Sequence, residues 1–297
     1  MADQSIAVIG LGSMGYGIAQ SCLRAGHRTF GYDTRPEQQT RFQEEGGAAE
    51  LLDVAAPTLS AAIIVVLNAQ QTEAVLTDLL PRMAAGAVVI ACATVPPAFA
   101  RAMAEAATAR GIHYLDAPIS GGAVKAAAGQ LSIMASGTPA AFAAAAPTLN
   151  AISETVLRLG DAPGAGSAMK AVNQLLAGVH IATMAEAMTF AMTQGIDPGT
   201  FMDVIPHCAG SSWMLENRGP HVVAGDYTPH SQVNIWPKDL GIVLDIAQEA
   251  GFPAAITQTA LAQYRKAVEM GLGTVDDAAV ARVYAEAVGL TLPGDAP

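Results

Sequence analysis

The chain has 297 residues, a formal net charge of −11, 52% hydrophobic residues and 14% charged residues. This length suits one large domain or two ordinary ones, and the composition is typical of a globular protein. The negative charge argues against a nucleic-acid partner, which would need a basic surface. The three cysteines are far apart and lack CxxC spacing, which argues against a disulfide framework or a zinc site and favours a reducing, cytoplasmic environment.

No targeting segment is recognisable before the first expected strand, and the longest apolar runs, around 61–67 and 87–95, are too short to span a bilayer. We therefore expect a soluble protein without a membrane partner. The six histidines show no metal-ligand spacing, and His180 in an apolar stretch is more typical of a core residue. No metal is predicted.

Strand and helix patterns alternate through the first half of the chain. Strands are expected at 6–9, 29–32, 62–67, 87–91, 112–116, 130–135 and 155–159, with helices from the first glycine-rich stretch to about 24 and at 35–45, 50–54, 71–80, 96–110 and 139–151. Buried runs that alternate with helices predict an α/β domain with a doubly wound, mostly parallel sheet. This sheet is expected to end near Gly160.

After the break at 160–166 the pattern becomes helical. From Ser167 to about Gln194 there is no proline and a single glycine, which predicts one helix on the order of 40 Å long at ~1.5 Å per residue. It is apolar nearly all round, so other helices or a second subunit must bury it. Further helices are expected at 198–208 (with Asp197 as N-cap), 238–249, 254–270 and 276–287, giving an α/β domain at 1–162 and an all-helical domain at 163–297.

A glycine-rich stretch, Gly10-Leu11-Gly12-Ser13-Met14-Gly15, joins the first strand to the first helix. In a dinucleotide-binding turn the first glycine allows the tight turn, the second lets the backbone approach a pyrophosphate, and the third brings the helix close to the strand. The N–H groups at the helix start then face the phosphates. The strand–turn–helix context predicts that this stretch binds a dinucleotide.

Asp33 lies at the end of the second strand, eighteen residues after Gly15, where a ribose-reading carboxylate belongs. A carboxylate there accepts hydrogen bonds from the 2′-hydroxyl and repels a 2′-phosphate, so NAD is favoured over NADP. Arg35 could approach a phosphate and works against that preference. The alternative is that Asp33 merely caps the next helix.

Ser120-Gly121-Gly122 follows the strand that ends at Asp116, at the sheet edge where ligands of parallel sheets collect. Its backbone N–H groups and hydroxyl can bind a carboxylate, although an ordinary glycine turn is the alternative. Lys170 is the only lysine in a long apolar stretch. If Ser167 caps the long helix, Lys170 lies in the first turn, where the helix dipole disfavours a cation and favours proton release to a substrate.

Asn173 and Gln174 follow Lys170 by three and four residues and share its helix face. The alternative for Lys170 is a lysine that reaches solvent near a helix end. Lys238 could contact a cofactor or substrate, or simply pair with Asp239 at the surface. Thr94 is either a helix N-cap or a cofactor neighbour.

Four patterns together resemble the β-hydroxyacid dehydrogenase family: the glycine-rich stretch at 10–15, the run Asp116-Ala117-Pro118-Ile119-Ser120-Gly121-Gly122, Gly164-x-Gly166-x-x-x-Lys170-x-x-Asn173, and Lys238-Asp239-Leu240. The resemblance implies an N-terminal Rossmann domain joined by a long helix to an all-α domain for substrate binding and dimerisation, in a homodimer or homotetramer. It also implies that Lys170 is the catalytic acid/base and that Ser120-Gly121-Gly122 and Asn173 bind the substrate.

In the same family Leu67-Asn68, Thr94 and Lys238 would approach the NAD cofactor, with Asn68 in place of a more usual proline. Gln174 stands where many members have a second asparagine, which points to an altered pocket. Within the family, the stretches 173–182, 211–218 and 226–231 look like the L-threonate dehydrogenases, which oxidise the 2-hydroxyl of a four-carbon sugar acid.

The expected function is therefore an NAD-dependent dehydrogenase of a small hydroxy acid. The alternatives are a 3-hydroxyisobutyrate dehydrogenase, a tartronate semialdehyde reductase and a non-catalytic NAD-binding sensor. Imine reductases share the architecture, but typically lack a lysine where Lys170 stands.

Overall fold

The computed structural model describes residues 4–295 and divides the chain into two compact units, residues 1–170 and 171–297. Residues 1–3 and 296–297 lie outside the described part, so the absence of a targeting segment there stays an expectation from sequence. Each unit has its own apolar core.

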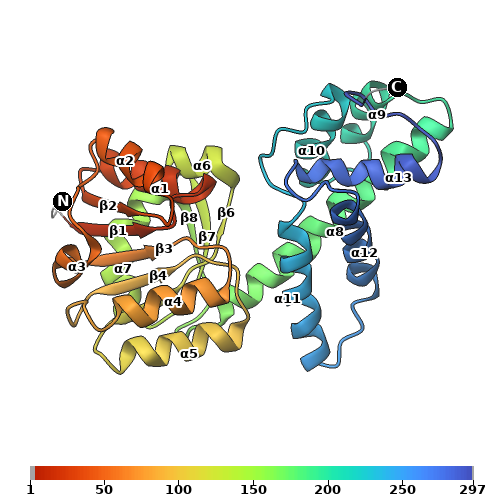
Figure 1. Cartoon of the computed structure of the whole chain (residues 1–297). Helices are drawn as coiled ribbons and strands as arrows, with labels where there is room; N and C mark the ends of the chain where they lie inside the picture. The colour runs from red at the N-terminus through yellow and green to blue at the C-terminus, as the bar shows by residue number, and fades with distance from the viewer. Residues whose placement is uncertain (1–3, 296–297) are drawn as a thin grey trace. The chain divides into compact units, whose positions relative to one another are not determined.

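The first unit is built on a parallel five-stranded sheet in the order β2-β1-β3-β4-β5 (Figure 1). The strands are β1 (Ser5–Ile9), β2 (Arg28–Tyr32), β3 (Ala61–Ile64), β4 (Val88–Ala91) and β5 (His113–Asp116). Successive β1 side chains enter opposite cores: Ile6 and Val8 pack in one, Ala7 and Ile9 in the other. This confirms the α/β doubly wound fold.

Helices cover both faces of this sheet. The core that contains Ile6 is closed by α1 (Ser13–Arg24) and α7 (Pro139–Ile152). The core that contains Ala7 is closed by α4 (Ala69–Leu79) and α5 (Pro97–Thr108), which lie together across the sheet in Figure 1. Between β2 and β3 the chain forms α2 (Pro36–Glu44), α3 (Leu52–Ala55) and a 3-10 turn, η1 (Ala56–Thr58).

The expected single sheet is wrong in one respect: the last strands form a second, three-stranded sheet, β6-β7-β8. Its strands are β6 (Ile119–Ser120), β7 (Leu131–Ala135) and β8 (Ser153–Arg158), with β6 antiparallel and β8 parallel to β7. Asp116 exchanges backbone hydrogen bonds with Ser136 in an antiparallel bridge, so the chain turns after β5. The sequence pattern also missed α6 (Gly122–Ala128), because the glycines at its start favour a turn.

The third strand is shorter than predicted. It ends at Ile64 rather than Leu67, because the next residues belong to the entry of α4: Asn68 Oδ1 accepts a hydrogen bond from the Gln71 N–H at 2.9 Å and caps the helix. The Leu67 N–H in turn donates to Gln71 Oε1 at 2.9 Å.

The long helix α8 runs from Ala165 to Thr193. Within residues 4–295 it is the one helix that is long and apolar enough to cross a membrane, a test that the core helices of water-soluble proteins also pass. Ile181, Met184 and Met188 on it are fully buried in the second unit's core. Other apolar side chains on α8 are exposed, among them Val172, Leu176 and Phe190.

The second unit is helical: α9 (Pro198–Val204), η2 (Ile205–His207), α10 (Trp213–Ala224), α11 (Ile235–Glu249), α12 (Ala255–Glu269), η3 (Asp277–Val280) and α13 (Ala281–Ala287). The prediction missed α10, whose interior contains Gly219 and Pro220. A Cβ on Gly219 would lie 2.2 Å from the Met202 sulfur, so the Met202 side chain of α9 packs directly against the α10 backbone and would have to move for any larger residue. The Tyr264 hydroxyl donates to the Gly178 carbonyl at 2.8 Å and ties α12 to α8.

Candidate active site

The glycine-rich turn lies between β1 and α1, as expected. A Cβ on Gly10 would lie 2.4 Å from the Val65 carbonyl oxygen, and one on Gly15 would lie 1.8 Å from the Gly10 oxygen. These two glycines are therefore required for packing. A Cβ on Gly12 would meet nothing within 4 Å, so the protein's own packing does not require glycine there.

Gly12 is also the N-cap of α1, where it supplies no side-chain acceptor, and the first turn of the helix has no acidic residue. The helix start therefore keeps N–H groups available for an anion. An open backbone surface at Gly12 beside these groups fits the pyrophosphate of a dinucleotide. Ser13 and Met14, the first two residues of the helix, complete the expected cofactor stretch.

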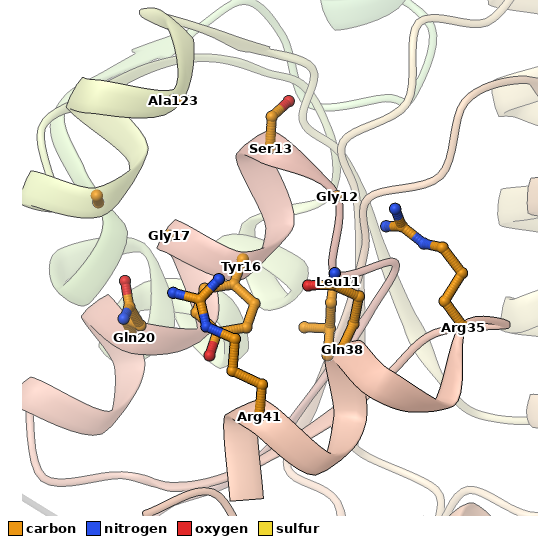
Figure 2. Close-up of a pocket in the computed structure, with 11 residues that line it drawn as sticks. Leu11, Gly12, Ser13, Tyr16, Gly17, Gln20, Arg35, Gln38, Arg41 and Ala123 are labelled. Carbon is orange, nitrogen blue, oxygen red and sulfur yellow. The ribbon is translucent and has the colours of Figure 1, made fainter. Parts of the chain in front are cut away.

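A hollow of about 340 Å³ adjoins this turn. Figure 2 shows Ser13 at the start of α1 and the Arg35 and Arg41 side chains on either side of Gln38. The Arg41 guanidinium lies 4.4 Å from the centre of the Tyr16 ring and pairs with Glu45 at 3.1 Å. Two cationic side chains, Arg35 and Arg41, thus line the hollow.

Asp33 is joined directly to the glycine turn: its Oδ2 accepts a hydrogen bond from the Leu11 N–H at 2.7 Å. Its Oδ1 accepts from the Arg35 N–H at 2.9 Å and pairs with Arg35 Nε at 3.1 Å. Burial would raise the pKa of Asp33, but the hydrogen bonds from Arg35 and Leu11 outweigh it and hold the pKa of this carboxyl below its ordinary value. Asp33 is therefore a fixed carboxylate with Arg35 beside it.

Three further residues predicted near the cofactor, Leu67, Asn68 and Thr94, lie in loops of the first unit. Leu67 is 55% exposed, and Asn68 caps α4. Thr94 is not an N-cap, because the N-cap of α5 is Pro96. Each follows a strand of the parallel sheet, β3 or β4, at its carboxyl end.

Ser120-Gly121-Gly122 spans the end of β6 and the first residue of α6. Gly121 and Gly122 have φ values of +133° and +76°, a region that side chains disfavour. A Cβ on Gly122 would meet nothing within 4 Å, so the backbone conformation, not packing, requires that glycine. The loop thus presents backbone N–H groups in an unusual conformation.

Lys170 is 9% exposed, and its Nζ donates a hydrogen bond to the Ile119 carbonyl at 3.0 Å. Ile119 immediately precedes Ser120, so the structure brings this lysine to the expected carboxylate loop. The alternative in which Lys170 extends into solvent is wrong.

The predicted start of the long helix is also wrong. Ser167 is not the N-cap: α8 begins at Ala165, so Lys170 lies beyond the first turn. The helix can begin earlier because buried side chains accept hydrogen bonds from its first N–H groups. Gly166 N–H donates to Ser136 Oγ, and Ser167 N–H donates to Asp116 Oδ2, both at 2.9 Å.

Asn173 and Lys238 belong to the second unit, where two other residues connect them. Asn173 Nδ2 donates to Gln174 Oε1 at 3.0 Å, Gln174 Nε2 donates to Asp239 Oδ2 at 2.5 Å, and Lys238 forms an ion pair with Asp239. Gln174 and Asp239 are buried. The expected pairing of Lys238 with Asp239 is confirmed. The pair does not lie fully at the surface, because Asp239 is only 3% exposed.

Asp116 and Asp239 lie in motifs that are recognisable in the sequence, but the sequence patterns assign neither residue a role. Both carboxylates are buried in the structure, and the burial of an acidic residue cannot be seen in the sequence alone. All three cysteines are free, and no group of three or more potential metal ligands occurs among the described residues.

The parallel sheet and the glycine turn at the start of α1 are those of a dinucleotide-binding protein. Comparisons with known proteins narrow this class. Residues 5–160 match the family model of the NAD binding domain of 6-phosphogluconate dehydrogenase. Residues 164–284 match that of the NAD-binding region of NADP-dependent 3-hydroxyisobutyrate dehydrogenase.

Whole-chain relatives agree with these matches. The L-threonate dehydrogenase of Cupriavidus necator is 47% identical, covering 99% of this chain and 99% of its own. The 3-hydroxyisobutyrate dehydrogenase of Pseudomonas aeruginosa is 36% identical, covering 82% and 85%. A crystal structure of a 3-hydroxyisobutyrate dehydrogenase from Salmonella typhimurium superposes with a TM-score of 0.89 at 47% identity, covering 95% of this chain and 100% of that chain.

The chain belongs to the β-hydroxyacid dehydrogenase family, whose members include 3-hydroxyisobutyrate dehydrogenase. It is an NAD(P)-dependent dehydrogenase of hydroxy acids, as the sequence predicted.

Proposed function

We propose that the protein oxidises the 2-hydroxyl of L-threonate to the 2-oxo acid with NAD, and that Lys170 is the general acid/base. The observation that carries the proposal is the 3.0 Å hydrogen bond from Lys170 Nζ to the carbonyl of Ile119, beside Ser120-Gly121-Gly122. It brings a buried amine next to backbone N–H groups that suit a carboxylate, and a 2-hydroxy acid carries its hydroxyl one carbon from its carboxylate.

In this proposal Ser120-Gly121-Gly122 binds the substrate carboxylate through its backbone N–H groups and the serine hydroxyl. Neutral Lys170 accepts the proton of the 2-hydroxyl, and its ammonium form returns a proton to the carbonyl oxygen in the reverse direction. The nicotinamide, when bound, accepts the hydride. Gly10-Leu11-Gly12-Ser13-Met14-Gly15 and Asp33 hold the cofactor, with Leu67, Asn68, Thr94 and Lys238 as further contacts, and Asn173 binds the substrate.

The choice of L-threonate is supported by the relative named L-threonate dehydrogenase, at 47% identity over nearly the whole of both chains. A second candidate, 3-hydroxyisobutyrate, is supported by the Salmonella structure of that name, which is also 47% identical. A polyhydroxylated substrate needs polar partners, and Asn173 together with the sequence stretch 211–218 supplies candidates. L-threonate is therefore our first choice.

The direct test is a panel of L-threonate, 3-hydroxyisobutyrate and D-glycerate, each assayed with NAD and with NADP. We expect the highest kcat/KM for L-threonate with NAD. A higher kcat/KM for 3-hydroxyisobutyrate would show that this compound, and not L-threonate, is the preferred substrate. Tight NADH binding without turnover of any hydroxy acid would instead favour a non-catalytic sensor.

We further propose that residues 1–162 form the NAD-binding domain and that residues 163–297 serve substrate binding and dimerisation. The exposed apolar side chains of α8 support a homodimer or homotetramer, because such a surface is costly in water. The free cysteines and the acidic charge are consistent with a cytoplasmic protein.

A further inference from the structure

Asp116 is the most highly connected buried carboxylate of the first unit. It is 1% exposed, and its Oδ2 accepts hydrogen bonds from the N–H groups of Gly164 and Ser167, each at 2.9 Å. Ser167 Oγ donates to Oδ1 at 2.6 Å, and Ser136 Oγ donates to Oδ2 at 3.1 Å. A buried carboxylate is tolerated when donors surround it, and a helix start is a favourable place for its charge.

These bonds explain the glycines that precede Lys170. A Cβ on Gly166 would lie 2.5 Å from the Met134 carbonyl oxygen, 2.7 Å from the Asp116 carbonyl oxygen and 3.1 Å from Asp116 Oδ2. Gly164 has a φ of +110°. The start of α8 therefore approaches Asp116 as closely as backbone allows, and only glycine fits at Gly166.

Both partners of the Lys170 hydrogen bond are connected to Asp116. Through the Asp116 carboxylate, the bonds to Gly164 and Ser167 fix the first turn of α8, three residues before Lys170. Through the Asp116 backbone, the bridge to Ser136 fixes the start of the segment that carries Ile119, three residues after Asp116. Asp116 thus links the start of α8 to the segment that carries the accepting carbonyl.

We propose that Asp116 is a positioning residue: it joins the start of α8 to the substrate-loop segment and thereby holds the Lys170 amine at Ile119, beside Ser120-Gly121-Gly122. Asp116 does not touch the reacting atoms. It acts through backbone geometry, and a displacement of about 1 Å at a reacting group is enough to cost a large part of the rate. The kinetic consequence rests on the proposed function, whereas the placement of Lys170 does not.

The test compares Asp116→Ala with Asp116→Asn. Alanine removes every side-chain acceptor. Asparagine keeps an oxygen for the two N–H groups, and the Ser167 hydroxyl can rotate to accept from the new amide. For L-threonate oxidation we expect kcat to fall 10- to 100-fold in Asp116→Ala. In Asp116→Asn, kcat should stay within about fivefold of the wild-type value. The KM for NAD should change less than twofold in both variants.

A second readout does not depend on turnover. Reductive methylation with formaldehyde and a borane, read by peptide mass spectrometry, measures how accessible the Lys170 amine is, with exposed Lys266 as the internal reference. In Asp116→Ala we expect Lys170 to react about tenfold faster relative to Lys266. Asp116→Asn should label like wild type.

The NADH-binding stoichiometry separates positioning from loss of folded protein. If Asp116→Ala lowers kcat and binding stoichiometry in proportion, with unchanged labelling of Lys170, Asp116 is merely structural and the proposal is overturned. Wild-type kcat and labelling in folded Asp116→Ala also overturn it. If Asp116→Ala does not fold, Ser167→Ala, which removes one donor, must show the same changes to a smaller degree. A wild-type enzyme that turns over no hydroxy acid refutes the proposed function, and the labelling result then still decides the role of Asp116.

Discussion

The starts of α1 and α8 in the first unit treat their unpaired backbone N–H groups in opposite ways. At α1 the N-cap Gly12 supplies no side-chain acceptor, and space is open where a side chain would stand. At α8 the early N–H groups are bonded to the buried side chains of Asp116 and Ser136. N–H groups at a helix start that have no acceptor in the protein are available to an anionic ligand. N–H groups that are hydrogen-bonded to buried side chains instead hold the helix start in place. The first suits a cofactor phosphate, and the second suits a side chain whose position must be fixed, as we propose for Lys170.

The largest expected effect is the loss of turnover when Lys170, on α8, is replaced. Lys170→Ala should lower kcat for L-threonate oxidation by about 10² to 10⁴, the usual contribution of a general acid or base. NADH affinity, measured by fluorescence titration, should change less than twofold, because Lys170 lies on α8 and not at the glycine turn. Lys266→Ala, at an exposed lysine of α12, is the matched control. Full turnover by Lys170→Ala would remove the lysine from the mechanism.

At the open helix start the three glycines should behave differently. Gly10→Ala and Gly15→Ala should not yield folded protein, because the new Cβ would lie 2.4 Å or 1.8 Å from a backbone oxygen. Gly12→Ala should keep its melting temperature within about 2 °C but bind NADH at least tenfold more weakly. Gly210→Ala is the control, since a Cβ there also meets nothing within 4 Å. Unchanged NADH binding by Gly12→Ala would show that the backbone at Gly12 does not approach the cofactor.

The choice between NAD and NADP depends on Asp33 and Arg35, next to the start of α1. Asp33→Asn should lower the ratio of kcat/KM for NAD over NADP about tenfold, because it removes the charge that repels a 2′-phosphate and releases Arg35 to approach one. The ratio for Arg35→Ala should move in the other direction. An unaltered ratio in both variants would mean that the ribose lies elsewhere.

Acid stability gives an independent check of Asp33. Its pKa is lower in the folded protein than in the unfolded chain, so its contribution to stability is present above pH ~4 and is lost as the pH falls through the lowered, folded-state value. Between those pH values the unfolding free energy of Asp33→Asn should therefore change less with pH than that of the wild type. Urea titrations at several acidic pH values measure this; identical pH slopes would show that the hydrogen bonds to Asp33 are not maintained in solution.

The smallest kinetic effect is expected in the second unit. Gln174→Met keeps the length of the side chain but removes both hydrogen bonds, which leaves the Asn173 amide unheld and Asp239 with one donor fewer. The KM for L-threonate should rise about 3- to 10-fold with little change in kcat. Gln248→Met, at an exposed position of α11, should change neither constant. A kcat loss as large as that of Lys170→Ala would place Gln174 in the chemical step.

The difference between the two helix starts also explains what the sequence could predict. The glycine turn was recognisable because β1, the turn and α1 are contiguous in the sequence and the glycines have the spacing of a dinucleotide-binding turn. The start of α8 was misplaced because its acceptors are Asp116 and Ser136, 51 and 30 residues away from the groups that donate to them. The pairing of Gln174 with Asp239 spans 65 residues and was invisible for the same reason. α6 was missed because it begins at Gly122, and α10 was missed because Gly219 and Pro220 lie in its interior. Tertiary packing overrides the low helix preference of these residues.

The difference between the two helix starts is tested most directly by measuring NADH affinity and kcat for L-threonate on the same two variants, Gly12→Ala and Asp116→Ala. We expect at least tenfold weaker NADH binding in Gly12→Ala and unchanged NADH binding in Asp116→Ala. At saturating NAD, kcat should fall 10- to 100-fold in Asp116→Ala. Equal losses of binding and turnover in both variants would contradict this difference, because the two helix starts would then serve a single purpose.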